Sequence, residues 1–116
     1  MKLADARFSA ADGALVASLS GEIDTSNAGD VGEAVLGALT NEARGLVVDL
    51  RSVGYLDSAG IHLLYRLARD VRARGQGLAL VLVAPSPTSD ALRLAGVERA
   101  FKIADTVDGG VAQLAV

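Results

Sequence analysis

The residues best suited to chemistry in this sequence lie in one short segment, Asp57 to His62. A carboxylate, the hydroxyl of Ser58 and the only imidazole of the chain occur there. A serine close to a histidine and an aspartate suggests nucleophilic catalysis. A serine at the start of a helix suggests an N-cap, whose oxygen accepts a hydrogen bond from a backbone N–H of the first turn. Spacing alone favours the N-cap for Ser58, because serine is common at helix starts for this reason.

Catalysis is the weaker interpretation of this segment. Leu56-Asp57-Ser58-Ala59-Gly60 is similar to the nucleophile elbow of serine hydrolases, but Leu56 stands where the first glycine should be. His62 lies one turn further along the same helix and faces outward, so it cannot act as a base from across a cleft. We therefore expect no catalytic residue and no enzymatic activity.

The residue types do not predict a metal site or a cofactor site either. The sequence has no cysteine and one histidine, which argues against thiolate and histidine metal sites. Gly75-Gln76-Gly77 is typical of a helix end, and the sequence contains no Walker-type phosphate loop. No metal ion and no cofactor are expected.

A helix must position Ser58. Residues from Ser58 to Arg74 repeat with a helical period, at about 100° per residue. One arc of this helix is aliphatic and consists of Ile61, Leu63, Leu64, Leu67, Ala68 and Val71. The opposite arc carries Ser58, His62, Tyr65, Arg66, Arg69 and Arg72. We predict that the aliphatic arc is buried and that Ser58 begins an exposed face.

The other elements predict one α/β domain over residues 1–116, with helices packed on a mixed β-sheet. The expected strands are Leu3–Ser9, Ala14–Ser20, Leu46–Leu50, Leu78–Val83 and Phe101–Ile103. The expected helices are Ala28–Leu39, Ser58–Arg74, Thr88–Ala95 and Asp108–Leu114. Asp12-Gly13 predicts a hairpin between the first two strands, and Thr25-Ser26-Asn27 can cap the first helix. The helix from Ser58 joins two strands in a right-handed crossover, which makes these strands parallel.

Composition limits the classes of partner. Hydrophobic residues make up 51% of the 116 residues, which excludes a disordered chain. The net charge of −3 gives no general attraction to nucleic acid or to anionic lipid. No apolar stretch is long enough to span a bilayer, and the N-terminus lacks the apolar core of a signal peptide. We expect no nucleic-acid partner, no membrane partner and a cytoplasmic location.

Two motifs resemble a known family. Leu46-Val47-Val48-Asp49-Leu50, followed by Tyr55-Leu56-Asp57-Ser58-Ala59-Gly60-Ile61, is similar to the signature of STAS domains, and specifically of bacterial anti-sigma factor antagonists. In that family an apolar strand leads into a loop of the type Asp-Ser-(Ser, Thr or Ala)-Gly at the start of a helix. Gly21-Glu22-Ile23-Asp24, with Ala28 after it, resembles the second recurring motif of the family. The expected order of elements also agrees, so the resemblance covers essentially the whole chain.

The resemblance implies roles for individual residues. Ser58 would accept a phosphate, Asp57 would be its neighbour on the same loop, and Gly60 would be the small residue that lets a partner approach. Asp24 matches the acid whose loop lies beside the phosphorylation site. The residues expected to bind a partner are Asp24, Thr25, Asp57, Ser58, Ala59, Gly60, His62, Arg66 and Arg69. Family members often have a small or apolar residue where this chain has His62, so His62 bears on which partner is recognised.

The implied partner is an anti-sigma factor with a serine kinase fold, which binds the unphosphorylated protein and releases it after phosphorylating Ser58. A serine phosphatase would reset this switch. Contact with an acidic patch of a partner and simple solubility are equally good explanations of Arg66, Arg69 and Arg72. A second class also stays open, because STAS-like domains occur as regulatory modules of transporters and in stress-sensing or lipid-trafficking complexes.

Overall fold

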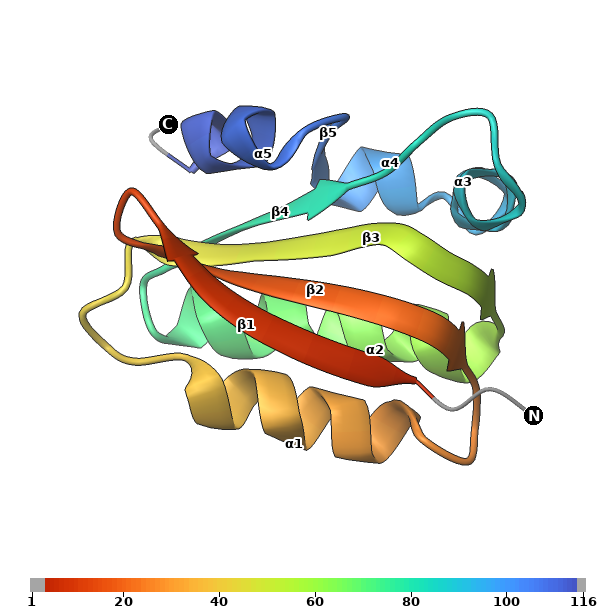
Figure 1. Ribbon diagram of the computed structural model, residues 1–116, viewed down its shortest axis with the longest axis horizontal. Helices are drawn as coiled ribbons and strands as arrows, with labels where there is room; N and C mark the ends of the chain where they lie inside the picture. The colour runs from red at the N-terminus through yellow and green to blue at the C-terminus, as the bar shows by residue number, and fades with distance from the viewer. Residues whose placement is uncertain (1–3, 115–116) are drawn as a thin grey trace.

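Five strands form a single mixed sheet in the computed structural model, which describes residues 4–114. The strands are β1 (Asp5–Ala11), β2 (Ala14–Ile23), β3 (Gly45–Leu56), β4 (Gly77–Val81) and β5 (Lys102–Ala104). They lie side by side in the order β1-β2-β3-β4-β5 (Figure 1). β1 runs antiparallel to β2, and the other neighbours are parallel. The predicted α/β class and mixed sheet are confirmed.

The predicted hairpin joins β1 to β2. Asp12 and Gly13 connect the strands with φ angles of 51° and 83°, both in the left-handed region. Two successive residues of this kind match the right-handed twist of the strands, which is why Asp-Gly is favoured here. Leu3, the expected start of the first strand, lies outside the described residues.

Five helices occur among the described residues: α1 (Ala28–Ala38), α2 (Ser58–Ala73), α3 (Pro87–Leu94), α4 (Val97–Ala100) and α5 (Val107–Gln113). Sequence periodicity missed α4, because one turn is too short to show a period. It also stopped the third strand at Leu50, whereas β3 continues to Leu56; in this extension only Val53 and Leu56 are buried. None of these helices is long and apolar enough to cross a membrane.

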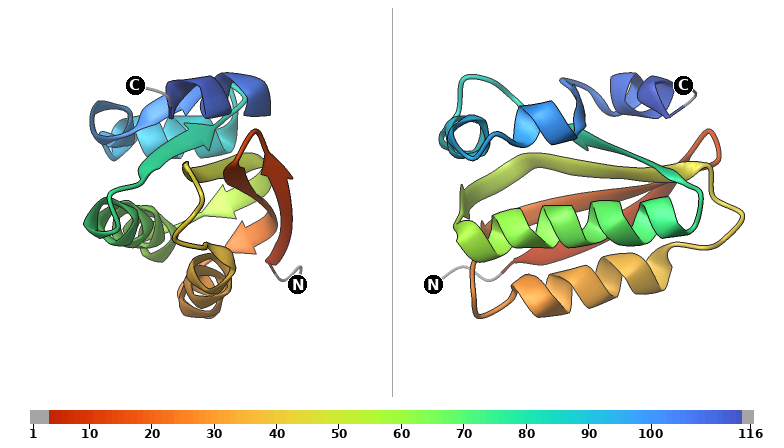
Figure 2. Two further views of the ribbon diagram at one scale, coloured as in Figure 1. Left: turned by 90° about the vertical axis from the view of Figure 1, so that its left-hand side faces the viewer. Right: turned by 180° about the vertical axis from the view of Figure 1, so that it is seen from behind.

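The helices divide between the two faces of the sheet. α1 and α2 cover one face, where Leu46, Val48 and Leu80 belong to the larger apolar cluster. α5 covers part of the other face, where Val111 packs against Val47. α3 and α4 contribute buried side chains to the larger cluster and therefore belong with α1 and α2. The end-on view of Figure 2 shows α1 and α2 on the side of the sheet opposite to α5.

The amphipathic character predicted for α2 is largely confirmed. Its buried residues are Gly60, Leu63, Leu64, Leu67, Ala68 and Val71. Ile61, expected in the buried arc, is only half-buried, since it lies at the edge of that arc. Arg66, expected to face solvent, is also half-buried. Arg66 is partly covered because it lies over Gly32 of α1.

Candidate functional site

The carboxyl ends of β2 and β3 bring the two sequence motifs together. Ile23 and Leu56, the last residues of these parallel strands, are register partners. The backbone N–H of Asp57 donates a hydrogen bond to the carbonyl of Ile23 at 3.3 Å. The two loops that begin at Asp24 and Asp57 therefore leave the sheet next to each other, and α1 and α2 start at the same end of the molecule (Figure 1).

Asp57, not Ser58, is the N-cap of α2. The Asp57 carboxylate accepts hydrogen bonds from the backbone N–H groups of Ala59 at 2.9 Å and Gly60 at 3.2 Å. The N-cap assignment of Ser58, favoured by spacing alone, is wrong. Aspartate and serine are equally good N-cap residues, and the extended backbone of Asp57, with ψ of −168°, decides between them.

Ser58 is consequently the first helical residue, and its side chain is free. The residue is exposed. Among the side chains and backbone groups of residues 4–114, none makes a hydrogen bond with the Ser58 hydroxyl. The carboxylate that could have bound this hydroxyl is engaged with the helix backbone instead. A hydroxyl in this position is accessible to a modifying enzyme.

The loop from β2 to α1 is fixed by its own polar side chains. The Asp24 carboxylate accepts hydrogen bonds from the backbone N–H of Ser26 at 2.9 Å and from the Ser26 hydroxyl. These two bonds hold the pKa of the Asp24 carboxyl below its ordinary value of 3.8, and the bond from the Ser26 hydroxyl has the larger effect. Asn27 occupies the N-cap position of α1 but makes no capping bond. Instead, its side-chain carbonyl accepts a hydrogen bond from the backbone N–H of Asp24, and its side-chain NH₂ donates one to the carbonyl of Glu22. The predicted side-chain cap is therefore wrong.

Gly60 serves the interior of the protein rather than its surface. It is buried, and a Cβ atom placed there would lie 2.7 Å from the Leu56 side chain and 3.3 Å from that of Ile23. The first turn of α2 can sit this close to β2 and β3 only because the residue has no side chain. The structure gives Gly60 a packing role against the sheet; that Gly60 also lets a partner approach stays a prediction.

A shallow groove runs between the first turns of α1 and α2. Its volume is about 190 Å³, and it is lined by Ala28, Gly29, Ala59, His62, Leu63 and Arg66. The helices approach closely further along, where a Cβ at Gly32 would lie 2.8 Å from Leu63. Small residues thus form one wall of the groove, while His62 and Arg66 supply its polar part.

The three arginines of α2 do not form one row. The Arg66 guanidinium lies over Gly32 of α1, 3.2 Å from where a Cβ would be. Arg69 is exposed and pairs at 3.8 Å with the neighbouring Asp70. Arg72 donates a hydrogen bond of 3.4 Å to the carbonyl of Ala100, at the other end of α2. Only Arg66 lines the groove near Ser58.

Two features near Ser58 escaped the sequence analysis. Tyr55, one residue before the end of β3, is 51% exposed in a chain that is only 3% aromatic. The groove wall at Ala28 and Gly29 is the other. Tyr55 could have been recognised from the loss of apolar continuity after Leu50, which indicates that this part of β3 has one open side. Thr25, which the sequence analysis did select, is exposed in the loop that follows β2.

The site around Ser58 is an exposed polar surface. Among residues 4–114, no three His, Cys, Asp or Glu side chains are grouped so that they could hold a metal ion. The combination that is present is an exposed hydroxyl at a helix start, two neighbouring carboxylate-bearing loops, and a small groove with a cationic side.

The chain is similar to known proteins in sequence and in structure. The sequence pattern of the STAS domain matches residues 6–110. The chain is 30% identical over 97 residues to the anti-sigma-F factor antagonist RsfB of Mycobacterium tuberculosis, covering 83% of this chain and 77% of RsfB. The crystal structure of an anti-sigma factor antagonist from Mycobacterium paratuberculosis has a TM-score of 0.85 at 24% identity, covering 98% of this chain and 96% of that one. The phosphorylated form of the Bacillus cell fate determinant SpoIIAA has a TM-score of 0.64 at 18% identity, covering 95% and 99%.

Proposed function

This chain belongs to the STAS domain family and is related to anti-sigma factor antagonists, and from that premise we propose that it binds an anti-sigma factor and is released when Ser58 is phosphorylated. The partner is an anti-sigma factor with serine kinase activity. A serine phosphatase restores the binding form. The protein itself acts as a non-catalytic regulator of transcription.

The free hydroxyl of Ser58 is the observation that carries this proposal. Because Asp57 satisfies the first N–H groups of α2, Ser58 is not needed for capping. Ser58 is an exposed residue, and its hydroxyl has no competing hydrogen bond among the described residues. A kinase can therefore reach the hydroxyl without unfolding the helix.

The surface around Ser58 suits a partner that distinguishes the two states. Asp24 and Thr25 lie in the loop that leaves β2 next to the start of α2. Ala59 follows Ser58 in α2, and Ala59, His62 and Arg66 line the adjoining groove. Arg69 extends this surface along α2. Since the β2–α1 loop and the start of α2 are both held by hydrogen bonds, the surface is already ordered before binding. Little ordering entropy then opposes association.

A phosphate at Ser58 affects binding more than folding. It adds about −1.5 to −2 charges. Attraction to the helix N-terminus, about 0.3–1 kcal/mol, is offset by repulsion from the adjacent Asp57. Beneath a docked partner, the same charge is desolvated or faces like charge, which costs several kcal/mol. Each 1.4 kcal/mol corresponds to tenfold in affinity, so the partner is released while the domain stays folded.

The experiment is phosphorylation by candidate anti-sigma kinases with ATP, followed by mapping of the phosphate by mass spectrometry. Ser58→Ala should lose the label but still bind the kinase. Ser58→Asp should bind at least about tenfold more weakly. The matched control is Ser52→Ala, which changes an exposed serine that lies on β3 and not in α2. This variant should be labelled like the unmodified chain.

Two results would overturn the proposal. If Ser58→Ala is labelled as strongly as the unmodified chain, Ser58 is not the switch residue. If no anti-sigma factor binds the unphosphorylated protein in a pull-down with purified components, the regulatory class is wrong.

A further inference from the structure

A hollow in the described part of the chain lies away from Ser58. It measures about 650 Å³ and sits where β4 and β5 end, between α3, α4 and α5. None of its lining residues belongs to the surface assigned to the anti-sigma factor. Its size falls in the range of about 300–1,000 Å³ that is usual for small-molecule sites.

The topology explains why a hollow forms at this place. The chain leaves β4 toward α3 and α4, which pack with the larger apolar cluster on one face. It leaves β5 toward α5, which packs on the opposite face. Two adjacent parallel strands whose connections diverge leave a crevice at their carboxyl ends, and open α/β sheets bind ligands in such crevices.

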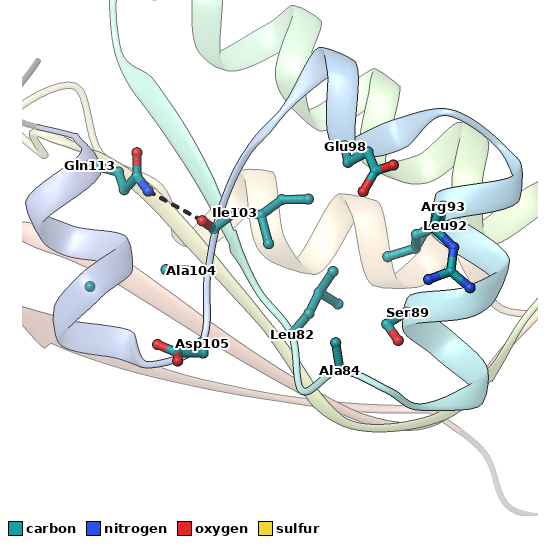
Figure 3. Close-up of a pocket in the computed structure, with 11 residues that line it drawn as sticks. Leu82, Ala84, Ser89, Leu92, Arg93, Glu98, Ile103, Ala104, Asp105 and Gln113 are labelled. Atoms are coloured by element: carbon teal, nitrogen blue, oxygen red, sulfur yellow. Dashed lines mark hydrogen bonds between the residues drawn. The ribbon is translucent and has the colours of Figure 1, made fainter.

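The floor of the crevice is apolar. Leu92 is 1% exposed and Leu82 is 8% exposed, and Ile103 projects toward both of them (Figure 3). The Gln113 amide donates a hydrogen bond of 3.2 Å to the carbonyl of Ile103, drawn in Figure 3, which closes part of the free edge of β5. A bound molecule therefore meets aliphatic side chains, and an added peptide strand would have to displace Gln113.

The rim of the crevice has unbalanced charge. The Arg93 guanidinium is bound to the Asp90 carboxylate at 3.0 Å. Glu98 and Asp105 also line the crevice and are exposed, and neither carboxylate has an ion pair or hydrogen bond to another of residues 4–114. The positive charge at the rim is thus neutralised, and two negative charges are left. An anionic ligand would be repelled here.

From this combination we propose that the crevice is a binding site for a small organic cation, an amine with an aliphatic body. The aliphatic part lies over Leu82, Leu92 and Ile103, where it removes apolar surface from water. The ammonium group lies at the rim, attracted by Glu98 and Asp105. This site is independent of Ser58 and of the anti-sigma factor.

The test is a titration followed by ¹H–¹⁵N NMR, with n-hexylammonium as the probe. n-Hexanoate and hexan-1-ol serve as probes of equal chain length with negative and zero charge. Hexylammonium should shift the amide signals of the crevice residues saturably, with a dissociation constant of about 1 mM for so small a ligand. Hexanoate and hexan-1-ol should bind at least about threefold more weakly, since exposed charge pairs contribute up to about fivefold.

Variants separate the charge from the cavity. Glu98→Gln combined with Asp105→Asn should weaken hexylammonium binding about threefold to fivefold and leave hexan-1-ol unchanged. Ala84→Leu, which fills part of the crevice from an exposed position, should weaken both probes. Glu33→Gln, an exposed carboxylate on α1, is the matched control and should change neither.

The proposal fails if hexylammonium produces no saturable shifts at the crevice residues. It also fails if hexanoate binds as tightly as hexylammonium, or if the double variant binds hexylammonium as the unmodified chain does. Anti-sigma factor binding plays no part in any of these measurements, so the outcome is separate from that of the Ser58 experiment.

Discussion

The carboxyl ends of the parallel strands form two regions, one at β2 and β3 and one at β4 and β5. The helices that follow the strands are placed differently in these two halves of the sheet. At the ends of β2 and β3, both following helices lie on the same face, and their first turns close tightly over the strands. At the ends of β4 and β5, the following helices lie on opposite faces, and a hollow of about 650 Å³ remains. The comparison shows that helix placement decides whether the ends of two parallel strands are covered by tightly packed helices or leave a crevice.

Packing distances show the same contrast at the level of single atoms. A Cβ on Gly60 would lie 2.7 Å from Leu56, closer than real Cβ atoms approach a neighbour. In the β4/β5 half, Ala84 already carries a Cβ and still borders open space. Adding atoms to the two halves should therefore have very different costs, and this difference can be measured.

The largest effect is expected for Gly60→Ala. One added methyl group forces Leu56 or the start of α2 to move, which should lower the free energy of unfolding by about 2–3 kcal/mol. Ala84→Leu adds more atoms to the crevice half but should change the free energy of unfolding by less than about 0.5 kcal/mol. Urea denaturation followed by circular dichroism measures both.

Gly37→Ala is the control for Gly60→Ala, because nothing lies within 4 Å of a Cβ at Gly37, which is also in a helix. This variant should be more stable by about 0.5–1 kcal/mol, from the helix propensity alone. Equal effects of Gly60→Ala and Ala84→Leu would show that the two halves are not packed differently.

The next largest effect compares the helix caps of the two halves. Asp57 accepts two backbone N–H groups of α2, and Ser86 accepts the N–H of Ser89 in α3. Asp57→Ala should cost about 1.5–2 kcal/mol, because a charged acceptor is lost, and Ser86→Ala about 1 kcal/mol. Thermal unfolding of both variants checks the order.

Asp57→Asn is the control that keeps a capping oxygen, and it should recover most of the loss. If Ser58→Ala were as destabilising as Asp57→Ala, the cap would belong to Ser58 after all, and its hydroxyl would not be free.

Much of the fold follows from local patterns in the sequence. The Asp12-Gly13 hairpin and the aliphatic face of α2 depend on neighbours in the chain, so spacing is enough to predict them. The choice between Asp57 and Ser58 as the N-cap cannot be predicted in this way, because both residue types suit that position. It is decided by the backbone where β3 ends beside β2, which is a tertiary contact.

The same limit applies to Gly60 and to the crevice. That Gly60 faces inward depends on how closely α2 sits on Leu56, and periodicity does not give this distance. The crevice depends on α5 crossing to the other face of the sheet, and α5 has only seven residues. So short an apolar pattern does not show which face it covers.

The β2/β3 half should also resist acid locally, because hydrogen bonds stabilise a charged group there. Since bonds from Ser26 lower the pKa of Asp24, its carboxylate contributes stability above the ordinary value of 3.8 and loses it as the pH falls through the lowered folded value. An NMR titration of the side-chain carboxyl carbon should show a midpoint below 3.8. Ser26→Ala should raise that pKa. A midpoint at or above the ordinary value would mean that the loop is not fixed in solution.

The smallest effect on stability is expected where the functional effect is greatest. Ser58→Asp places a negative charge on the first residue of α2, where the helix dipole attracts it and the Asp57 carboxylate repels it. The free energy of unfolding should change by less than about 0.5 kcal/mol in urea denaturation. A loss of about 1.5 kcal/mol or more would indicate that charge at Ser58 disrupts the start of α2. Phosphate on Ser58 would then act by unfolding the start of α2. If the stability is unchanged, phosphate acts on the contact with the partner.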